Sequence, residues 1–144
     1  MKPTEKQIEE IADNLDLGMR CFYNLKTGEL KTLLNTDRWI GEDLETWEED
    51  REQIDENWAD YFEFDSFDAY NSFKIMVDFA ESIGDLRLHE RLINALNRPK
   101  PFRNFKWQID NSGLFRQKWF DFKKLRYIQF VKEQIDLNEQ IFNE

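Results

Sequence analysis

Apolar residues recur every three or four positions along most of this chain, the spacing at which side chains share one face of an α-helix. The first predicted helix follows Thr4-Glu5-Lys6-Gln7, which matches a capping box, and ends near Gly18. Further helices are predicted at about 42–57, 66–83, 85–97 and 101–110. The predicted buried positions of these helices are Ile8, Ile11, Ala12, Leu15, Leu44, Trp47, Ile54, Trp58, Tyr70, Phe73, Met76, Val77, Ala80, Leu88, Leu92, Ala95, Leu96, Phe102, Phe105 and Ile109.

Residues 19–34 have the pattern of a β-hairpin. Strand-forming residues lie on both sides of Lys26-Thr27-Gly28, where Gly28 is free to take a positive φ. A lone hairpin is only marginally stable, and the weak alternation at 58–64 offers a third strand. The predicted fold class is therefore α+β, with a small antiparallel sheet packed against a mainly helical C-terminal half, in a single domain of residues 1–144.

The apolar residues of 114–135 do not fit one straight helix, because at 100° per residue they point in every direction. Two helices would restore order, one from Leu114 to Phe120 capped by Ser112 and one capped by Asp121. The sequence therefore predicts a bend near 120–123, and a frayed tail after Leu137. The inward face of the second helix would consist of Leu125, Ile128, Val131 and Ile135.

Charge is unevenly distributed along the chain. The whole chain of 144 residues has a net charge of −10, yet residues 98–132 contain 10 basic and 2 acidic residues. Residues 1–97 contain 24 acidic and 10 basic residues. The net negative charge disfavours a polyanionic partner, so we expect the two halves to face each other, within one chain or across a dimer.

Membrane and secretory proteins are disfavoured by the same composition. No apolar run approaches the ~18 residues that a membrane-spanning helix needs, and the N-terminus lacks the apolar centre of a signal peptide. We expect a cytoplasmic protein without a membrane partner.

Residues with catalytic potential are few. The chain has a single cysteine, Cys21, and a single histidine, His89, and it lacks a Gly-rich phosphate loop and a Gly-x-Ser-x-Gly elbow. Asp78 and Glu81 beside Arg103 could form an acid–base pair, but acidic residues are too numerous for one pair to carry weight. The sequence therefore predicts no enzyme, no catalytic residue, no metal site and no cofactor.

The segment 98–126 combines basic and aromatic residues, and two interpretations stay open. In the first, Phe102, Phe105, Trp107, Trp119 and Phe122 belong to the core, and Arg103 and Lys106 lie on these rings and pair with the acidic helix at 42–57. In the second, the segment is a binding surface. Its candidate binding residues are Arg103, Lys106, Trp107, Trp119 and Lys123.

Three short motifs carry a family resemblance: Arg91-Leu92-x-x-Ala95-Leu96, Phe102-Arg103-x-Phe105-Lys106 and Trp119-Phe120-x-Phe122. Over about 67–135 the chain resembles a widespread bacterial uncharacterised protein family of the UPF type. It departs from the pattern at Pro99-Lys100-Pro101, where small residues are expected. The resemblance implies an α+β fold of strands followed by helices, and it implies no activity.

These observations favour a protein-interaction or assembly module, whose partner is an unknown protein or a second copy of the chain. The alternative is a nucleic-acid-binding protein that uses segment 98–126, because a basic groove with stacking aromatics holds single strands. The helical core spacing of Phe102 and Phe105 and the net negative charge disfavour that alternative.

Overall fold

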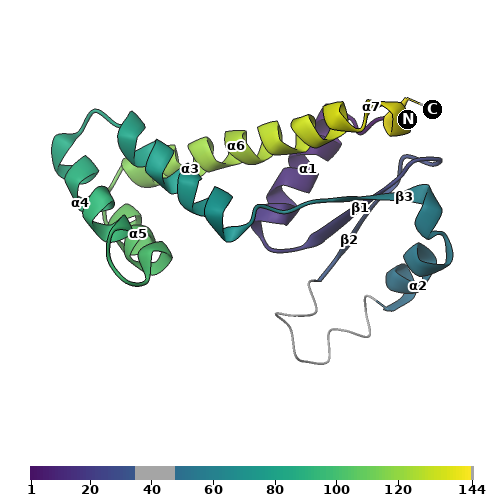
Figure 1. Ribbon diagram of the computed structural model, residues 1–144, viewed down its shortest axis with the longest axis horizontal. Helices are drawn as coiled ribbons and strands as arrows, with labels where there is room; N and C mark the ends of the chain where they lie inside the picture. The colour runs from purple at the N-terminus through teal and green to yellow at the C-terminus, as the bar shows by residue number, and fades with distance from the viewer. Residues whose placement is uncertain (35–47, 144) are drawn as a thin grey trace. The chain divides into compact units, whose positions relative to one another are not determined.

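The computed structural model describes residues 1–34 and 48–143, so the part of the predicted acidic helix at 42–47 lies outside the described residues. The fold is α+β, with a small antiparallel sheet and a helical C-terminal half, as the sequence predicts (Figure 1). The chain divides into two compact units. We call Met1–Ser66 with Tyr127–Glu144 the sheet unit, and Phe67–Arg126 the helical unit. Within the described ranges, no helix is both long and apolar enough to cross a membrane.

The sheet has three antiparallel strands in the order β2-β1-β3. These strands are β1 (Arg20–Asn24), β2 (Leu30–Leu33) and β3 (Tyr61–Phe64), which confirms the hairpin and the third strand. The hairpin turn is held by the Asn24 side chain, whose Oδ1 accepts from the backbone N–H of Lys26 (2.9 Å) and Thr27 (3.0 Å). Gly28 has a φ of +74°, the left-handed conformation predicted for it.

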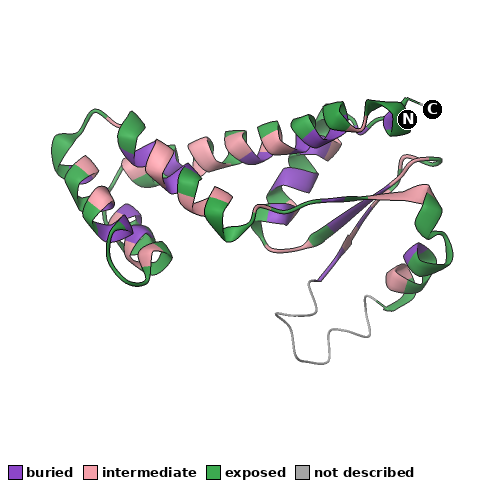
Figure 2. Cartoon of the chain, in the orientation of Figure 1, coloured by how far each residue is buried: buried purple, intermediate pink, exposed green. Residues whose placement is uncertain are grey.

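One face of the sheet is covered by α1 (Glu5–Asp16) and by the end of the chain. The predicted capping box of α1 is present, and its four predicted apolar positions are buried (Figure 2). The predicted fraying after Leu137 is wrong, because α7 (Glu139–Phe142) follows and Phe142 is fully buried. The Phe142 ring lies 4.9 Å from that of Phe62 and 5.9 Å from that of Tyr23, so aromatic packing holds the tail.

The other face of the sheet packs against α2 (Glu48–Glu56) through Phe22, Leu33 and Ile54. Burial of Trp58 was predicted from helical spacing and is wrong, since its side chain is 76% exposed. The reason is that α2 ends at Glu56, and a short 3-10 helix, η2 (Trp58–Asp60), changes the direction of the chain. The helical phase that aligned Trp58 with Ile54 therefore does not continue.

The helical unit contains α3 (Ala69–Ser82), α4 (Leu86–Leu96), α5 (Pro101–Asp110) and the first part of α6. Asp68 caps α3 through the backbone N–H of Asn71, and Asp85 caps α4 through the backbone N–H of Leu88. Trp119 fills the centre, with its ring centroid 4.9 Å from that of Phe105 and 5.3 Å from that of Phe79. The buried core of the unit consists of Ile75, Met76, Phe79, Ala80, Leu88, Leu92, Leu96, Phe105, Ile109 and Trp119.

The predicted break near 120–123 is wrong, because α6 (Phe115–Leu137) is one continuous helix. Its apolar residues point in every direction because residues up to Arg126 belong to the helical unit and those from Tyr127 belong to the sheet unit. Each half therefore has its own buried side. Leu125 is 67% exposed, against the prediction, whereas Val131 is fully buried.

Three aromatic residues predicted as core in the helical unit are exposed: Tyr70 (72%), Phe102 (46%) and Trp107 (62%). Trp107 follows the buried Phe105 by two positions, so at 100° per residue it points about 200° away from the core. Phe102 and Tyr70 lie in the first turns of α5 and α3. Helical spacing places a residue on a face of its helix but does not determine whether a neighbouring element covers that end.

Candidate functional site

A surface pocket of about 260 Å³ lies between α4 and α5, within the helical unit. Its lining combines two arginines, three side-chain amides, one small residue and one indole. The lining residues are Arg91, Asn94, Ala95, Arg98, Asn104, Trp107 and Gln108.

The turn between α4 and α5 positions the two walls of this pocket. Lys100 takes the left-handed conformation (φ 59°), and Pro101 follows as the first residue of α5, where its missing N–H costs nothing. Asn104 closes the turn, because its Nδ2 donates to the carbonyl of Pro99 at 2.9 Å. The two helices are thus held side by side, as Figure 1 shows.

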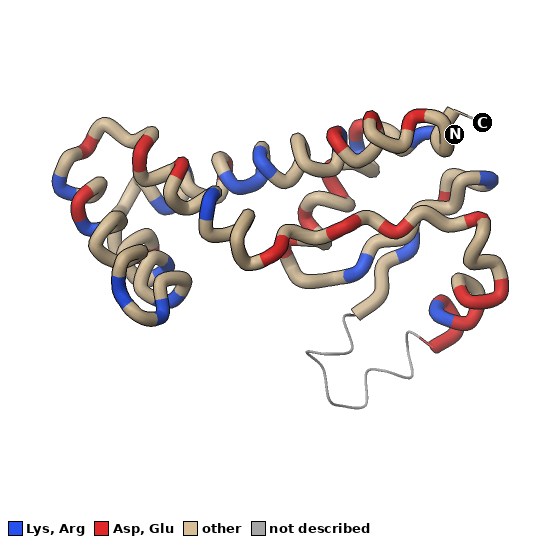
Figure 3. The backbone as a smooth tube through the Cα atoms, in the orientation of Figure 1, with Lys and Arg blue, Asp and Glu red and all other residues tan. Residues whose placement is uncertain are grey.

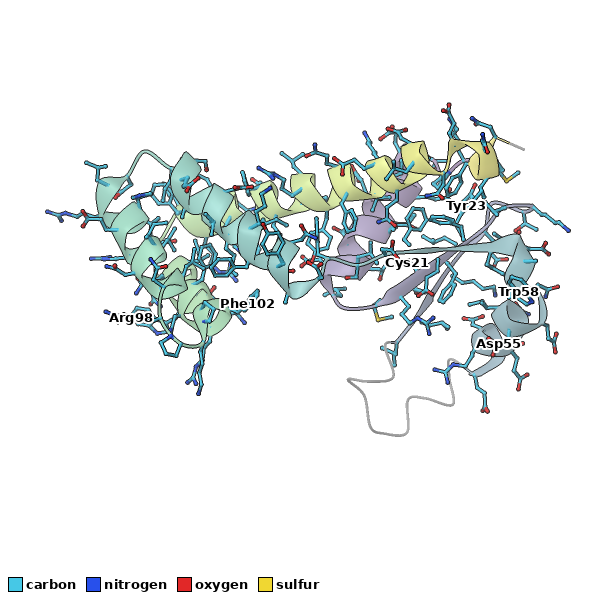
Figure 4. The ribbon with its side chains drawn as sticks, viewed as in Figure 1. Cys21, Tyr23, Asp55, Trp58, Arg98 and Phe102 are labelled. Carbon is cyan, nitrogen blue, oxygen red and sulfur yellow. The ribbon has the colours of Figure 1, made fainter. Side chains whose placement is uncertain are left out.

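Positive charge and an exposed ring meet at this pocket. Arg91 lies on α4, Arg98 follows the C-cap residue Asn97 of that helix, and both line the pocket. Neither arginine forms an ion pair with any residue that the structure describes. Figure 4 shows Arg98 at the α4–α5 turn, and Trp107 adds an indole that is 62% exposed.

The residues predicted to bind lie in different environments. Arg103 and Lys106 are exposed on α5, and Trp107 lines the pocket. Trp119 is 9% exposed and belongs to the core, as the first interpretation of this segment expects. Lys123 is half-buried, with its Nζ 5.7 Å from the Trp119 ring and 5.4 Å from the Phe120 ring.

Five polar lining residues were not among the predicted binding residues: Arg91, Asn94, Arg98, Asn104 and Gln108. They are polar surface positions, where amides and arginines are common. Only the packing of α4 against α5 distinguishes these residues from other surface positions.

The acidic helix α2 has a partner that the sequence did not predict. Lys31 is buried (8% exposed), and its Nζ donates to Asp50 (3.1 Å) and to Gln53 (2.6 Å). Burial lowers the pKa of Lys31, but the hydrogen bond and charge of Asp50, with smaller contributions from Glu29 and Tyr61, raise the pKa by more. Within the described part of the chain, Arg103 and Lys106 form no ion pair.

The other candidate chemical groups have structural partners. Burial, with a smaller effect from Glu63, raises the pKa of the Cys21 thiol to about 12 and so suppresses the nucleophilic thiolate. His89 Nδ1 lies 2.7 Å from the carbonyl of Ala80, and Asp78 pairs with Arg126 at 3.0 Å. Among residues 1–34 and 48–143, no group of three or more His, Cys, Asp or Glu side chains is placed to hold a metal ion.

The model of an uncharacterised protein family, UPF0158, matches residues 3–143 of the chain. The chain belongs to the UPF0158 family. The match confirms the resemblance and extends it to the N-terminal half, where the sequence motifs were weak. Curated proteins and solved structures gave no match. A function for this UPF0158 chain must therefore be argued from the pocket itself.

Proposed function

We propose that this chain is a protein-interaction module whose α4–α5 pocket binds an acidic segment of a partner protein. The observation that carries the proposal is that Arg91 and Arg98, without ion pairs among the described residues, lie beside the exposed Trp107. Arginine and tryptophan dominate the binding energy of protein interfaces. A guanidinium group also binds a carboxylate through two parallel hydrogen bonds.

The size and lining of the pocket support a peptide as the ligand. Its volume of about 260 Å³ is below the ~300–1,000 Å³ of typical small-molecule sites, so one or two side chains fit better than a whole substrate. No carboxylate lines it, so a negatively charged group meets no repulsion inside. Asn94 and Gln108 offer amide donors and acceptors that suit the backbone of a bound segment.

Charge around the pocket has the same sign as its arginines. The helical unit contains 12 basic and 7 acidic residues, whereas the rest of the chain contains 8 basic and 23 acidic residues. Figure 3 shows basic residues gathered on the turn between α4 and α5. Such a local field attracts an acidic segment before contact and speeds association at low ionic strength.

The proposal is tested by the anisotropy of a fluorescein-labelled peptide that contains Asp, Glu and Trp. The double variant Arg91→Glu/Arg98→Glu should weaken binding by at least about tenfold, which corresponds to about 1.4 kcal/mol. Lys74→Glu/Lys124→Glu makes the same charge change at exposed positions of α3 and α6, outside the pocket. An equal loss in this control would show non-specific attraction and would overturn the pocket as the site.

Single-stranded nucleic acid is a second candidate because the exposed Trp107 beside two arginines is also a stacking platform. A mixed-sequence oligonucleotide is titrated at several salt concentrations. If the pocket binds nucleic acid, affinity falls linearly with salt on a double logarithmic scale, and Trp107→Ala abolishes it. The protein-partner proposal would give way to nucleic-acid binding if the oligonucleotide binds more tightly than the peptide. That binding must also be lost in Arg91→Glu/Arg98→Glu and in Trp107→Ala.

A further inference from the structure

We infer that the acidic partner is a second copy of this chain, whose segment Glu52–Trp58 docks against the α4–α5 pocket. The inference rests on the proposed function of that pocket. It identifies the partner by the chemistry of a surface on the sheet unit, which we call the acidic indole patch and define as Glu52, Asp55, Glu56 and Trp58.

The acidic indole patch is exposed and its charges are available. Glu52, Asp55 and Glu56 are exposed on α2, and none of them forms an ion pair with a described residue. The Trp58 side chain is 76% exposed. Figure 4 shows Asp55 and Trp58 at the same end of α2, so carboxylates and an indole are displayed together.

The patch is held in place by the hairpin turn. The backbone N–H of Asp60 donates to the carbonyl of Asn57 (2.8 Å), which forms the short helix that presents Trp58. Leu25 N–H donates to the carbonyl of Asp60 (2.8 Å), and the Asp60 carboxylate pairs with Lys26 (3.1 Å). An apolar ring this exposed, on a segment this well fixed, loses little conformational entropy on binding.

The patch and the pocket are complementary in charge and in kind. The patch offers carboxylates next to one indole, and the pocket offers two guanidinium groups next to another indole. Arg91 and Arg98 can each take a carboxylate in two-point contact, while Trp58 covers the exposed Trp107. The two surfaces belong to different compact units of the chain.

Contact between two different surfaces leaves a free pocket on one copy and a free patch on the other. The free pair can meet reciprocally in a two-fold dimer or join further copies in chains or rings. A pocket of about 260 Å³ offers a small contact, and complexes with small interfaces are weak, so assembly should depend strongly on concentration. Because the contact is ionic, added salt should weaken it.

The test is sedimentation velocity of the full chain over about a hundredfold range of concentration, enough to span a dissociation constant. The weight-average sedimentation coefficient should rise with concentration and fall with salt. Arg91→Glu/Arg98→Glu and Asp55→Lys/Glu56→Lys should each remain monomeric, and circular dichroism checks that both fold. Glu9→Lys/Glu10→Lys, the same charge change on exposed residues of α1, should assemble like the native chain.

Mixing the two monomeric variants gives the decisive readout. One retains an intact patch and the other an intact pocket, so the mixture should form complexes that contain both variants, although each variant alone is monomeric. A mixture that stays monomeric, or a native chain that is monomeric at every concentration, overturns the inference. If the chain does not self-assemble but still binds the acidic peptide, the proposed function stands and only the inference fails. If it does not bind the peptide either, the proposed function fails as well.

Discussion

Phe102 and Phe105 are one helical turn apart on α5, yet their environments differ. Phe105 is 1% exposed and packs against Trp119, whereas Phe102 is 46% exposed. We expect Phe105→Ala to lower the free energy of unfolding by about 3–5 kcal/mol, because it empties a closed core. Phe102→Ala, the matched control, should cost less than about 1 kcal/mol. Urea denaturation of both variants checks this, and similar losses would mean that Phe105 is not a core residue.

Cys21 gives stability a dependence on pH at the alkaline end. Its pKa is 9.0 when unperturbed and about 12 in the folded chain. Below pH 9 both states hold the proton, and above it the unfolded chain ionises first, so Cys21 lowers stability by about 1.4 kcal/mol per pH unit between these values. Cys21→Ala should remove this contribution.

The measurement is the free energy of unfolding at about pH 8 and about pH 10.5, which lie on either side of the onset of ionisation. Burial also raises the pKa of Tyr23, and that residue is common to both proteins. The difference between native chain and variant therefore isolates Cys21. If the native chain and Cys21→Ala lose the same free energy of unfolding between the two pH values, the thiol is not buried and protonated in the folded chain.

At the scale of elements, α6 is one continuous helix although its apolar residues do not lie on a single face. If α6 is one helix, Lys124 lies in its interior, and Lys124→Pro removes a backbone hydrogen bond at a cost of about 3 kcal/mol or more. If Asp121 capped a separate helix, position 124 would lie in the first turn and proline would be tolerated. Lys124→Ala is the control at the same exposed position. Helical circular dichroism with urea denaturation distinguishes the two cases.

Helix α2 depends on one buried contact. Six of the nine residues of Glu48–Glu56 are acidic, and Ile54 is the one buried residue among them. Lys31 compensates by reaching Asp50 and Gln53 from β2. The charged face of this helix was predictable from the sequence, but the buried lysine that anchors it was not.

At the scale of the molecule, the chain separates charge between two compact units while sharing one helix. Helix α6 supplies residues to both units, so unfolding of either one removes the support for half of a shared helix. That residues 1–144 form a single domain stays a prediction, which can be tested by its unfolding. We expect one cooperative transition, in which amide hydrogens of Tyr23 and Phe105 exchange with the same free energy of opening. Two separate values would show two independent domains.

The sequence by itself determined the local structure of this protein. The capping box at Thr4, the turn at Gly28, the cap at Asp85 and the inward face of α4 all follow from interactions within a few residues. The residues that make such contacts are close together in the sequence, so the contacts can be predicted without knowing which distant residues pack nearby. The sequence places Arg91 and Trp107 on separate helices, and it did not show that the two residues line one pocket.

Tertiary structure decided which apolar residues became core. Phe142 is buried because distant strands supply Tyr23, Phe62 and Phe64 around it, although its own segment looks like a tail. Trp107 is exposed because the core lies on the Phe105 side of α5. Periodicity defines the faces of a helix, but burial depends on what the rest of the chain places against each face.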